Sequence, residues 1–348
     1  MTITMTGGAL PPAASPVPNP FHIPELAGRS LRPLAPWRYP VHNDYYADVD
    51  NTELSFATFA AYLPDPLADL DYRGRMVVVA GQSGSGKTSL IHRCVAEMQR
   101  LMTGRGLCAV VDLSSRRPMP VTRDNRTEVA SVDEFLNDLA EQVRAHLAVK
   151  YEDFRDDDPV IRPAVTTYTR ISAQLQRAGG VLAIILPRLE DAVNAPPPNS
   201  GAAAYHPVQR YMELRFERII FFAESLDPEG VRHWHDHISG MGDREDALLL
   251  EVGSLDERDG WTFAEDRISR CTHPEVPTVE ESTMLDVVSN HSPMSLSRLQ
   301  DICHSVWENV IIQRPGTSIV TPDDFARYYT DNSTRFRARN PLPRNGKP

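Results

Sequence analysis

The residues with the clearest chemistry run from Gly81 to Thr88 and read Gly-Gln-Ser-Gly-Ser-Gly-Lys-Thr. They fit the pattern G-x-x-x-x-G-K-[ST], in which a glycine-rich loop wraps backbone N–H groups around phosphates. The lysine of this pattern reaches the β- and γ-phosphates, and the hydroxyl after it ligates Mg²⁺. We therefore expect a nucleotide-binding P-loop. The expected phosphate contacts are Gly81, Ser83, Gly84, Ser85, Gly86, Lys87, Thr88 and Ser89.

The segments on either side of this loop have the patterns that the motif requires. Residues 76–80 are an apolar run suited to a buried strand, and residues 89–102 place apolar side chains at helical spacing. A strand, a glycine loop and a helix in this order are the context that supports a P-loop. The helix N-terminus adds its positive dipole end to the phosphate site.

Strands and helices alternate over the rest of the first 250 residues. We expect four further strands and three further helices; the strands are 107–111, 181–186, 218–223 and 247–252, and the helices are 53–63, 131–149 and 166–178. This alternation predicts a parallel five-stranded sheet with helices on both faces, the three-layer α/β sandwich of P-loop NTPases. From residue 255 the pattern is helical, which predicts a small α-helical lid domain.

Composition divides the chain into four parts. Residues 1–40 are rich in Pro, Ala and Gly and are expected to be a disordered arm, followed by aromatic residues at 37–46 that we expect to dock. The ATPase domain is expected at 41–252 and the lid at 253–330. Residues 331–348 end in arginines and one lysine without an acid after 335, which predicts a basic disordered tail.

The charge and cysteine content narrow the class of protein. The 348 residues carry a net charge of −11, so attraction of the whole chain to nucleic acid is not expected, although the basic tail leaves a local contact open. No apolar run approaches about 18 residues, so we expect no membrane span. The 4 cysteines form no C-x-x-C pair, which fits a reduced, cytoplasmic setting.

This order of elements resembles the AAA+ and STAND branches of the P-loop ATPases over roughly residues 53–330. Residues 294–299 and 319–325 are similar to the end of the lid in origin-recognition and related AAA+ proteins. The resemblance implies ATP or ADP with Mg²⁺ as ligands, and a homo-oligomer or a protein partner. It also implies a sensor-2 role for Arg298, an arginine finger at Arg244 and a sensor-1 role for Ser225.

The sequence departs from this family at the Walker B strand, which should end in two acids. Residues 181–186 run into Pro187 and Arg188, and the acids Glu190 and Asp191 come only afterwards. A turn at Pro187 would bring Glu190 back. Otherwise the acid comes from another strand end, Asp112 or Glu224, and an Asp at the first of these is typical of small-molecule kinases. We expect the metal-shell acid nearer Glu190 or Asp191 than Asp112.

A histidine-rich stretch at 233–237, His-Trp-His-Asp-His, invites a metal interpretation. On a helix only its first and last histidines share a face, so we interpret it as a solvated polar helix.

Three functions follow from these patterns and stay open at this point. The first is a regulatory or motor ATPase that couples nucleotide state to assembly or partner binding. The second is a small-molecule kinase or other phosphotransferase that uses Asp112. The third is a nucleotide-binding scaffold without turnover, which the departure at Pro187 favours.

Overall fold

Five parallel strands form one sheet in the order β2-β5-β6-β1-β7. The strand that leads into the P-loop, β1, lies between β6 and β7. The strands are β1 Arg75–Ala80, β2 Cys108–Asp112, β5 Val181–Ile185, β6 Ile219–Ser225 and β7 Ala247–Glu251. The computed structural model describes residues 17–26, 32–116, 120–123, 126–129, 132–155, 162–191, 216–240 and 246–339. The predicted five-stranded parallel sheet is confirmed, since each strand overlaps the range expected from the sequence.

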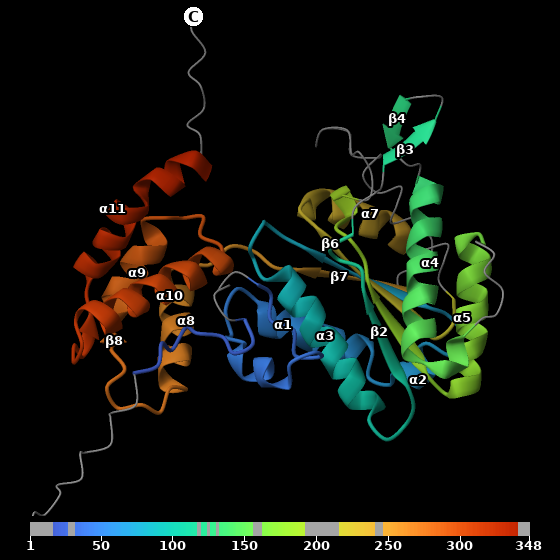
Figure 1. Ribbon diagram of the computed structural model, residues 1–348, viewed down its shortest axis with the longest axis horizontal. Coiled ribbons are helices and arrows are strands. Elements are labelled where there is room, and N and C mark those ends of the chain that lie inside the picture. Colours follow the sequence, from blue (N-terminus) through green and yellow to red (C-terminus); the bar gives the residue numbers. More distant parts are fainter. Residues whose placement is uncertain are drawn as a thin grey trace, which may run out of the picture.

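Helices cover both faces of this sheet and give three layers (Figure 1). Met76 and Val78 of β1 pack with α4, α5 and α7, whereas Val77 and Val79 pack with α1 and α3. This division follows from the two-residue period of a strand, whose successive side chains point to opposite faces. The helices are α1 Thr52–Tyr62, α2 Pro66–Asp69, α3 Lys87–Met102, α4 Val132–Lys150, α5 Ala164–Ala178 and α7 Pro228–Gly240, with 3-10 turns η1 Pro40–Tyr45, η2 Glu152–Phe154 and η3 Leu189–Asp191.

A hairpin between β2 and α4 was not expected from the sequence. Its strands are β3 Pro120–Arg123 and β4 Arg126–Val129, and they pair in an antiparallel ladder. Strands of four residues give too short an alternation to stand out in a sequence.

The lid consists of four helices around their own core, at the left of Figure 1. They are α8 Glu257–Ser269, α9 Glu281–Ser289, α10 Leu296–Gln313 and α11 Pro322–Arg339, and the short strands β8 Thr278–Val279 and β9 Ile319–Val320 pair between them. Trp307 and Phe263 lie at the centre of this core. The last helix, α11, continues to Arg339 and so extends past residue 330, where the lid was expected to end. The rest of the predicted tail, residues 340–348, lies outside the described residues.

The N-terminal arm is packed in the parts that the structure describes, which corrects the expectation of disorder over residues 1–40. Phe21 is fully buried in the lid core, with its ring centroid 4.7 Å from that of Trp307 and 5.8 Å from that of Phe263. Leu34 is buried against the P-loop helix side of the molecule, where its carbonyl accepts from His92. A few apolar residues therefore anchor this Pro-rich segment, because the lid core and the P-loop helix each offer a surface for them to pack against. Residues 1–16 and 27–31 lie outside the description.

Candidate nucleotide site

The P-loop lies between β1 and α3 and contacts the lid directly. Gly84 has a φ of 80°, and a Cβ added there would come within 2.8 Å of the Ser295 hydroxyl. Its carbonyl also accepts a hydrogen bond of 3.0 Å from the backbone N–H of Ser297 at the start of α10. Glycine is therefore required at this position both by the backbone angle and by the approach of the lid.

Lys87 is buried, and its ammonium group is held by the loop itself. The Nζ atom donates to the carbonyl oxygens of Gly81, at 2.9 Å, and Gln82, at 2.6 Å. Burial lowers the pKa of Lys87, while the nearby carboxylates of Glu224 and Glu190 act to raise it. Lys87 thus carries its charge into the space above the loop, beside two acids.

The neighbouring Thr88 is paired with an acid from a different strand. Its hydroxyl donates a hydrogen bond of 2.5 Å to Oε1 of Glu224. Glu224 stands on β6 beside Val79 of β1, and its side chain is buried. A hydroxyl and a carboxylate are both oxygen donors of the kind that Mg²⁺ prefers, so this pair fits a magnesium ion.

Glu190 reaches the same end of the sheet through the turn after β5. Its Oε1 accepts from the Ser225 hydroxyl at 2.6 Å and from the backbone N–H of Leu226 at 2.8 Å. Its Oε2 is buried and has no hydrogen-bond partner within the described part of the chain. The turn at Pro187 thus brings Glu190 and Ser225 together. Asp191 ends η3, and its side chain is not described.

The structure does not bring Asp112 to the P-loop. Asp112 ends β2, and β5 and β6 lie between that strand and β1. Three interstrand spacings, about 14 Å in total, therefore separate β2 from β1. Its carboxylate accepts from the hydroxyl of Ser114 at 2.6 Å and lies 3.5 Å from the guanidinium of Arg38.

Of the two arginines expected from the family resemblance, only Arg298 lies within the described residues. Arg298 lies on α10, where Leu296, Ser297 and Gln300 line the pocket above the P-loop and Arg298 does not. Its charge acts instead on His291, whose pKa is lowered by burial first and by Arg298 to a smaller extent. Arg244 lies outside the described residues, so its role stays a prediction.

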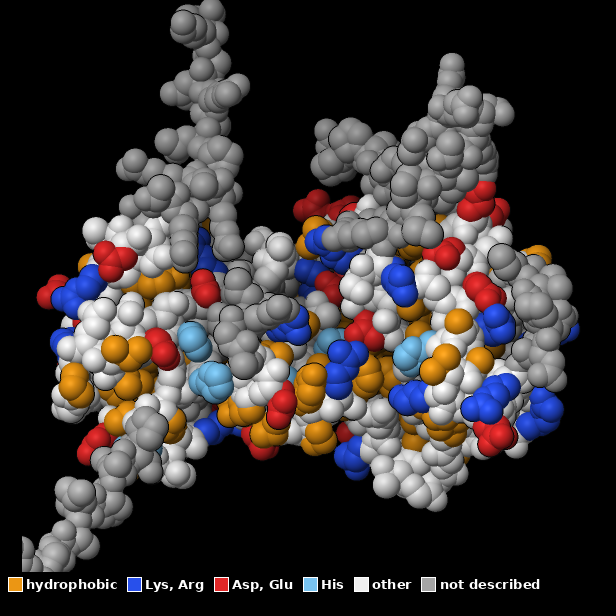
Figure 2. All heavy atoms as spheres, in the orientation of Figure 1, with side chains coloured by type: hydrophobic (Ala, Val, Ile, Leu, Met, Phe, Trp, Pro, Cys, Tyr) orange, Lys and Arg blue, Asp and Glu red, His pale blue; other side chains and the backbone are white. Residues whose placement is uncertain are grey.

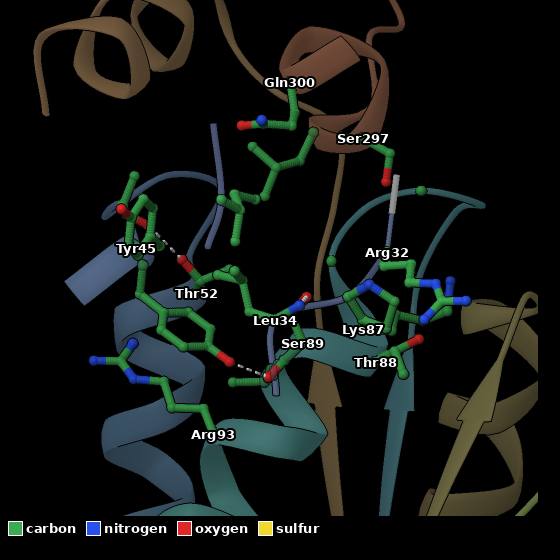
Figure 3. Close-up of a pocket in the computed structure, with 18 of the residues that line it drawn as sticks. Arg32, Leu34, Tyr45, Thr52, Lys87, Thr88, Ser89, Arg93, Ser297 and Gln300 are labelled. Carbon is green, nitrogen blue, oxygen red and sulfur yellow. Dashed lines mark hydrogen bonds between the residues drawn. The ribbon is translucent and has the colours of Figure 1, made fainter. Parts of the chain in front are cut away.

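A pocket opens above the P-loop, with walls from the loop, the arm and the lid (Figure 3). Two hydrogen bonds to Ser89 hold the arm and the aromatic segment after it against the pocket: the Leu34 N–H donates to the Ser89 hydroxyl at 3.1 Å, and the Tyr46 hydroxyl donates to the Ser89 carbonyl at 2.7 Å. Arg32 of the arm lines the pocket together with Lys87 and Thr88, and Figure 3 shows the three on the same side of it. The other wall residues include Ile23, Tyr45, Ala47, Thr52, Arg93, Phe263, Arg267, Leu296 and Gln300.

Several of these wall residues escaped the sequence reasoning. Glu224 was considered only as one of several acids at a strand end, and its signal was the apolar run before it. The aromatic residues at 37–46 were expected to dock without a stated place, and Tyr45 and Tyr46 dock on this pocket. Arg32, Arg267 and Gln300 had no sequence signal, because distant parts of the chain converge there.

The histidine stretch forms no metal site within its described side chains, which include His233 and His235 but not His237. Among the side chains that the structure describes, no group of three His, Cys, Asp or Glu residues could hold a metal ion. On the face in Figure 2, acidic and basic side chains are interspersed over the lid and the sheet domain. No helix in the described part of the chain has the length and apolar character to cross a membrane.

Comparison with known proteins identifies the fold. The ORC2 protein of Aeropyrum pernix in its ADPNP–ADP complexes is similar with a TM-score of 0.54 and 15% identity, over 82% of this chain and 70% of that one. Its ADP form gives a TM-score of 0.52 at 16% identity, over 82% and 69%. The A. pernix ORC1 protein in complex with DNA gives 0.51 at 13% identity, over 86% and 70%.

No family model matches the sequence, and the search of curated proteins gives no match either. The likeness is therefore one of fold. The chain shares the fold of these ORC proteins, an α/β sandwich with a parallel five-stranded sheet followed by a helical lid.

Proposed function

We propose that this chain binds ATP with Mg²⁺ between its P-loop and its lid, and that it acts as an AAA+-type ATPase that couples nucleotide state to assembly or partner binding. The observation that carries this proposal is the hydrogen bond between Thr88 and Glu224. It joins the hydroxyl of the P-loop motif to a buried carboxylate, which is the oxygen pair that a nucleotide-bound magnesium ion needs.

Each residue of the loop has a part in this proposal. Phosphate oxygens replace the carbonyls of Gly81 and Gln82 as acceptors for Lys87, whose ammonium group then faces the β- and γ-phosphates. Thr88 and Glu224 would hold Mg²⁺, which would supply positive charge to offset that of the phosphates. Arg32 lines the same pocket from the arm and supplies a further positive charge for the phosphates.

Glu190 and Ser225 are the residues that we assign to water activation. The unpartnered Oε2 of Glu190 is available to accept a proton from a water aligned with the γ-phosphate. Ser225 fixes the other carboxylate oxygen of Glu190 and so sets the direction of Oε2. Under this proposal the two acidic roles that the family places at one strand end are divided: Glu224 on β6 serves the metal, and Glu190 in η3 activates the water.

The lid is the element that responds to the nucleotide. Its helix α10 bonds the P-loop through the Ser297 N–H and the Gly84 carbonyl, and the arm ties the same loop to the lid core. A change at the phosphates therefore changes contacts that position the lid, which is how a local charge event alters a distant surface. Under this proposal Arg298 acts within its own subunit once the lid turns, and Arg244 acts on a neighbouring subunit.

The similar structures support the nucleotide part of this proposal, since two of them are complexes with ADP or with ADPNP and ADP. One similar structure is a complex with DNA. The mixed charge of the visible surface does not favour DNA for this chain, so we propose a protein partner or a second copy of the chain.

A nucleotide-binding scaffold without turnover is the second candidate. It is favoured by the same Glu190 contacts, because a carboxylate already bonded to Ser225 and Leu226 is held back from a water. A kinase that uses Asp112 is disfavoured by the position of that residue on β2, away from β1.

Phosphate release from ATP in the presence of Mg²⁺ separates the ATPase from the scaffold. We expect slow turnover that Glu190→Gln abolishes while ATP binding persists. A protein that binds ATP but releases no phosphate, with or without Glu190, would leave the scaffold as the function. Phosphate transfer to an added small-molecule acceptor, lost in Asp112→Asn alone, would favour the kinase.

A further inference from the structure

Two polar side chains of the lid lie buried in the wall of the pocket with part of their hydrogen-bonding capacity unused. Arg267 of α8 is 4% exposed, and its Nε and Nη1 have no acceptor among the residues that the structure describes. Gln300 of α10 is 6% exposed, and its Oε1 has no donor in the same part of the chain. Both line the pocket above the P-loop. Such groups are destabilising in a folded protein unless ordered water or a ligand satisfies them.

The surroundings of these two side chains suit a flat aromatic ligand. The guanidinium carbon of Arg267 lies 4.8 Å from the ring centroid of Tyr45 and 5.3 Å from that of Phe263. Apolar side chains make up much of the adjoining wall, among them Ile23, Leu34, Ala47 and Leu296. Ligand pockets combine an apolar lining with a few placed polar groups in this way. In Figure 3, Gln300 and Tyr45 lie at the opposite end of the pocket from Arg32 and Thr88.

The orientation of the Gln300 amide is fixed by its other contact. Its Nε2 donates a hydrogen bond of 2.7 Å to the backbone carbonyl of Phe21, which can only accept. The free Oε1 can therefore only accept a hydrogen bond from a ligand. Arg267 has donors and no acceptor. Together the two side chains match a ligand edge that has a donor beside an acceptor.

We propose that Arg267 and Gln300 read the base of the bound nucleotide and select adenine. The 6-amino group of adenine donates to Oε1 of Gln300, and a ring nitrogen beside it accepts from Arg267. Guanine has an oxygen at position 6, which would face the Gln300 oxygen with no proton between them. This inference rests on the proposed nucleotide site and deepens it, because it names the residues that choose the base.

The Phe21 contact connects this selection to the arm. Gln300 holds the arm through its Nε2 and meets the base through its Oε1. The arm in turn bonds the P-loop helix through Leu34 and Ser89. Gln300 therefore joins the base to the lid and the arm, and a separate contact of the arm, at Leu34, reaches the P-loop helix.

Equilibrium binding to the full chain with a panel of nucleotides tests the proposal without any mutation. We expect wild-type protein to bind ATP about tenfold more tightly than GTP or the N6,N6-dimethyl form of ATP, which lacks the 6-amino donor. Dimethylated ATP or GTP that binds as tightly as ATP would overturn the assignment of Gln300 to the 6-position.

Substitutions test the two residues separately, with inorganic tripolyphosphate as a ligand that has no base. Gln300→Met and Arg267→Met should each weaken ATP about tenfold and leave tripolyphosphate unchanged, and Gln300→Met should bring the ATP to GTP ratio near one. Gln313→Met and Arg258→Met make the same changes at exposed positions of α10 and α8 and should alter nothing. Thermal unfolding of each variant checks that it is folded.

The outcomes separate this inference from the proposed function. A wild-type chain that binds neither ATP nor tripolyphosphate would overturn the proposed nucleotide site, and with it the selection of adenine by Arg267 and Gln300. A chain that binds ATP through Lys87, but whose ATP to GTP ratio is the same in wild type and Gln300→Met, overturns only the base reading.

Discussion

The Thr88 hydroxyl and the Glu224 carboxylate lie 2.5 Å apart across two adjacent strands of one parallel sheet. Thr88 belongs to the P-loop helix and Glu224 to β6, so the pairing depends on β6 lying directly beside β1. The strand that the family resemblance assigns to the acids is β5, one position further along the sheet. The proposed metal site is thus built with an acid from the neighbouring strand.

Replacement of Lys87 tests the phosphate site. We expect Lys87→Ala to weaken ATP binding roughly 10- to 100-fold, because a charged hydrogen bond to phosphate is lost. The fold should stay intact, since Nζ contacts only the carbonyls of the loop. Titration of a fluorescent ATP analogue measures the effect, and wild-type affinity in a folded variant would refute the P-loop assignment.

The arm should contribute to the stability of the lid. Phe21→Ala removes a fully buried ring that packs against Trp307 and Phe263, so we expect the free energy of unfolding to fall by about 3–5 kcal/mol. Tyr72→Ala, at a ring that is 88% exposed, is the matched control and should change stability little. Denaturant unfolding gives both values. Equal stability of the two variants would mean that the arm is not anchored in the lid.

Asp50 should make stability depend on pH between about 4 and 6. It lies beside the lid helix α8, where its backbone N–H donates to Asp259 at 3.3 Å. Its carboxylate accepts from the Gly253 N–H at 2.9 Å, and its pKa is raised to about 6, chiefly by burial. Asp259 and Asp256 contribute to this rise in pKa, and the hydrogen bond from Gly253 opposes it. Because the folded state binds the proton more tightly than the unfolded chain, the free energy of unfolding decreases as pH rises from about 4 to about 6.

Asp50→Asn keeps the acceptor for Gly253 and cannot ionise. Asn also tolerates the φ of 53° at this position. We expect the variant to gain about 1 kcal/mol at pH 7 after allowance for the half-exposed carboxylate, and to lose the slope between pH 4 and 6. Unfolding curves at several pH values measure this. A slope that persists in Asp50→Asn would assign it to another group.

Self-association should follow ATP binding. We expect Arg244→Ala subunits to bind ATP but lose turnover or assembly, and mixing them with Lys87→Ala subunits to restore part of the activity through one intact composite site. Arg298→Ala should not be rescued in this way. Light scattering and phosphate release follow the two effects, and a wild-type protein that stays monomeric with ATP and Mg²⁺ at high concentration would exclude the proposal.

The sequence predicted the sheet and the P-loop well because their signals are local. Apolar runs of five or six residues marked all five strands of the sheet, and the glycine spacing marked the phosphate loop. The arm was interpreted as disordered because its composition, averaged over forty residues, hides a few anchors such as Phe21 and Leu34.

The pocket was beyond sequence reasoning because it forms from distant positions. Gln300 bonds the carbonyl of Phe21 across 279 positions of the chain, and Thr88 bonds Glu224 across 136. No periodicity or short motif encodes such a pairing. The turn after Pro187 was foreseen as a way for Glu190 to return, but its bond to Ser225 needed the strand order.

The magnesium dependence of ATP binding is the most direct test of the central claim. Calorimetric titration of ATP, with Mg²⁺ and with a chelator, compares wild type with Glu224→Gln and with Asp112→Asn. We predict that Mg²⁺ strengthens ATP binding in wild type and in Asp112→Asn, and that Glu224→Gln binds ATP in chelator like wild type but gains little from Mg²⁺. A Glu224→Gln protein with the full gain from Mg²⁺, or an Asp112→Asn protein without it, would contradict the account.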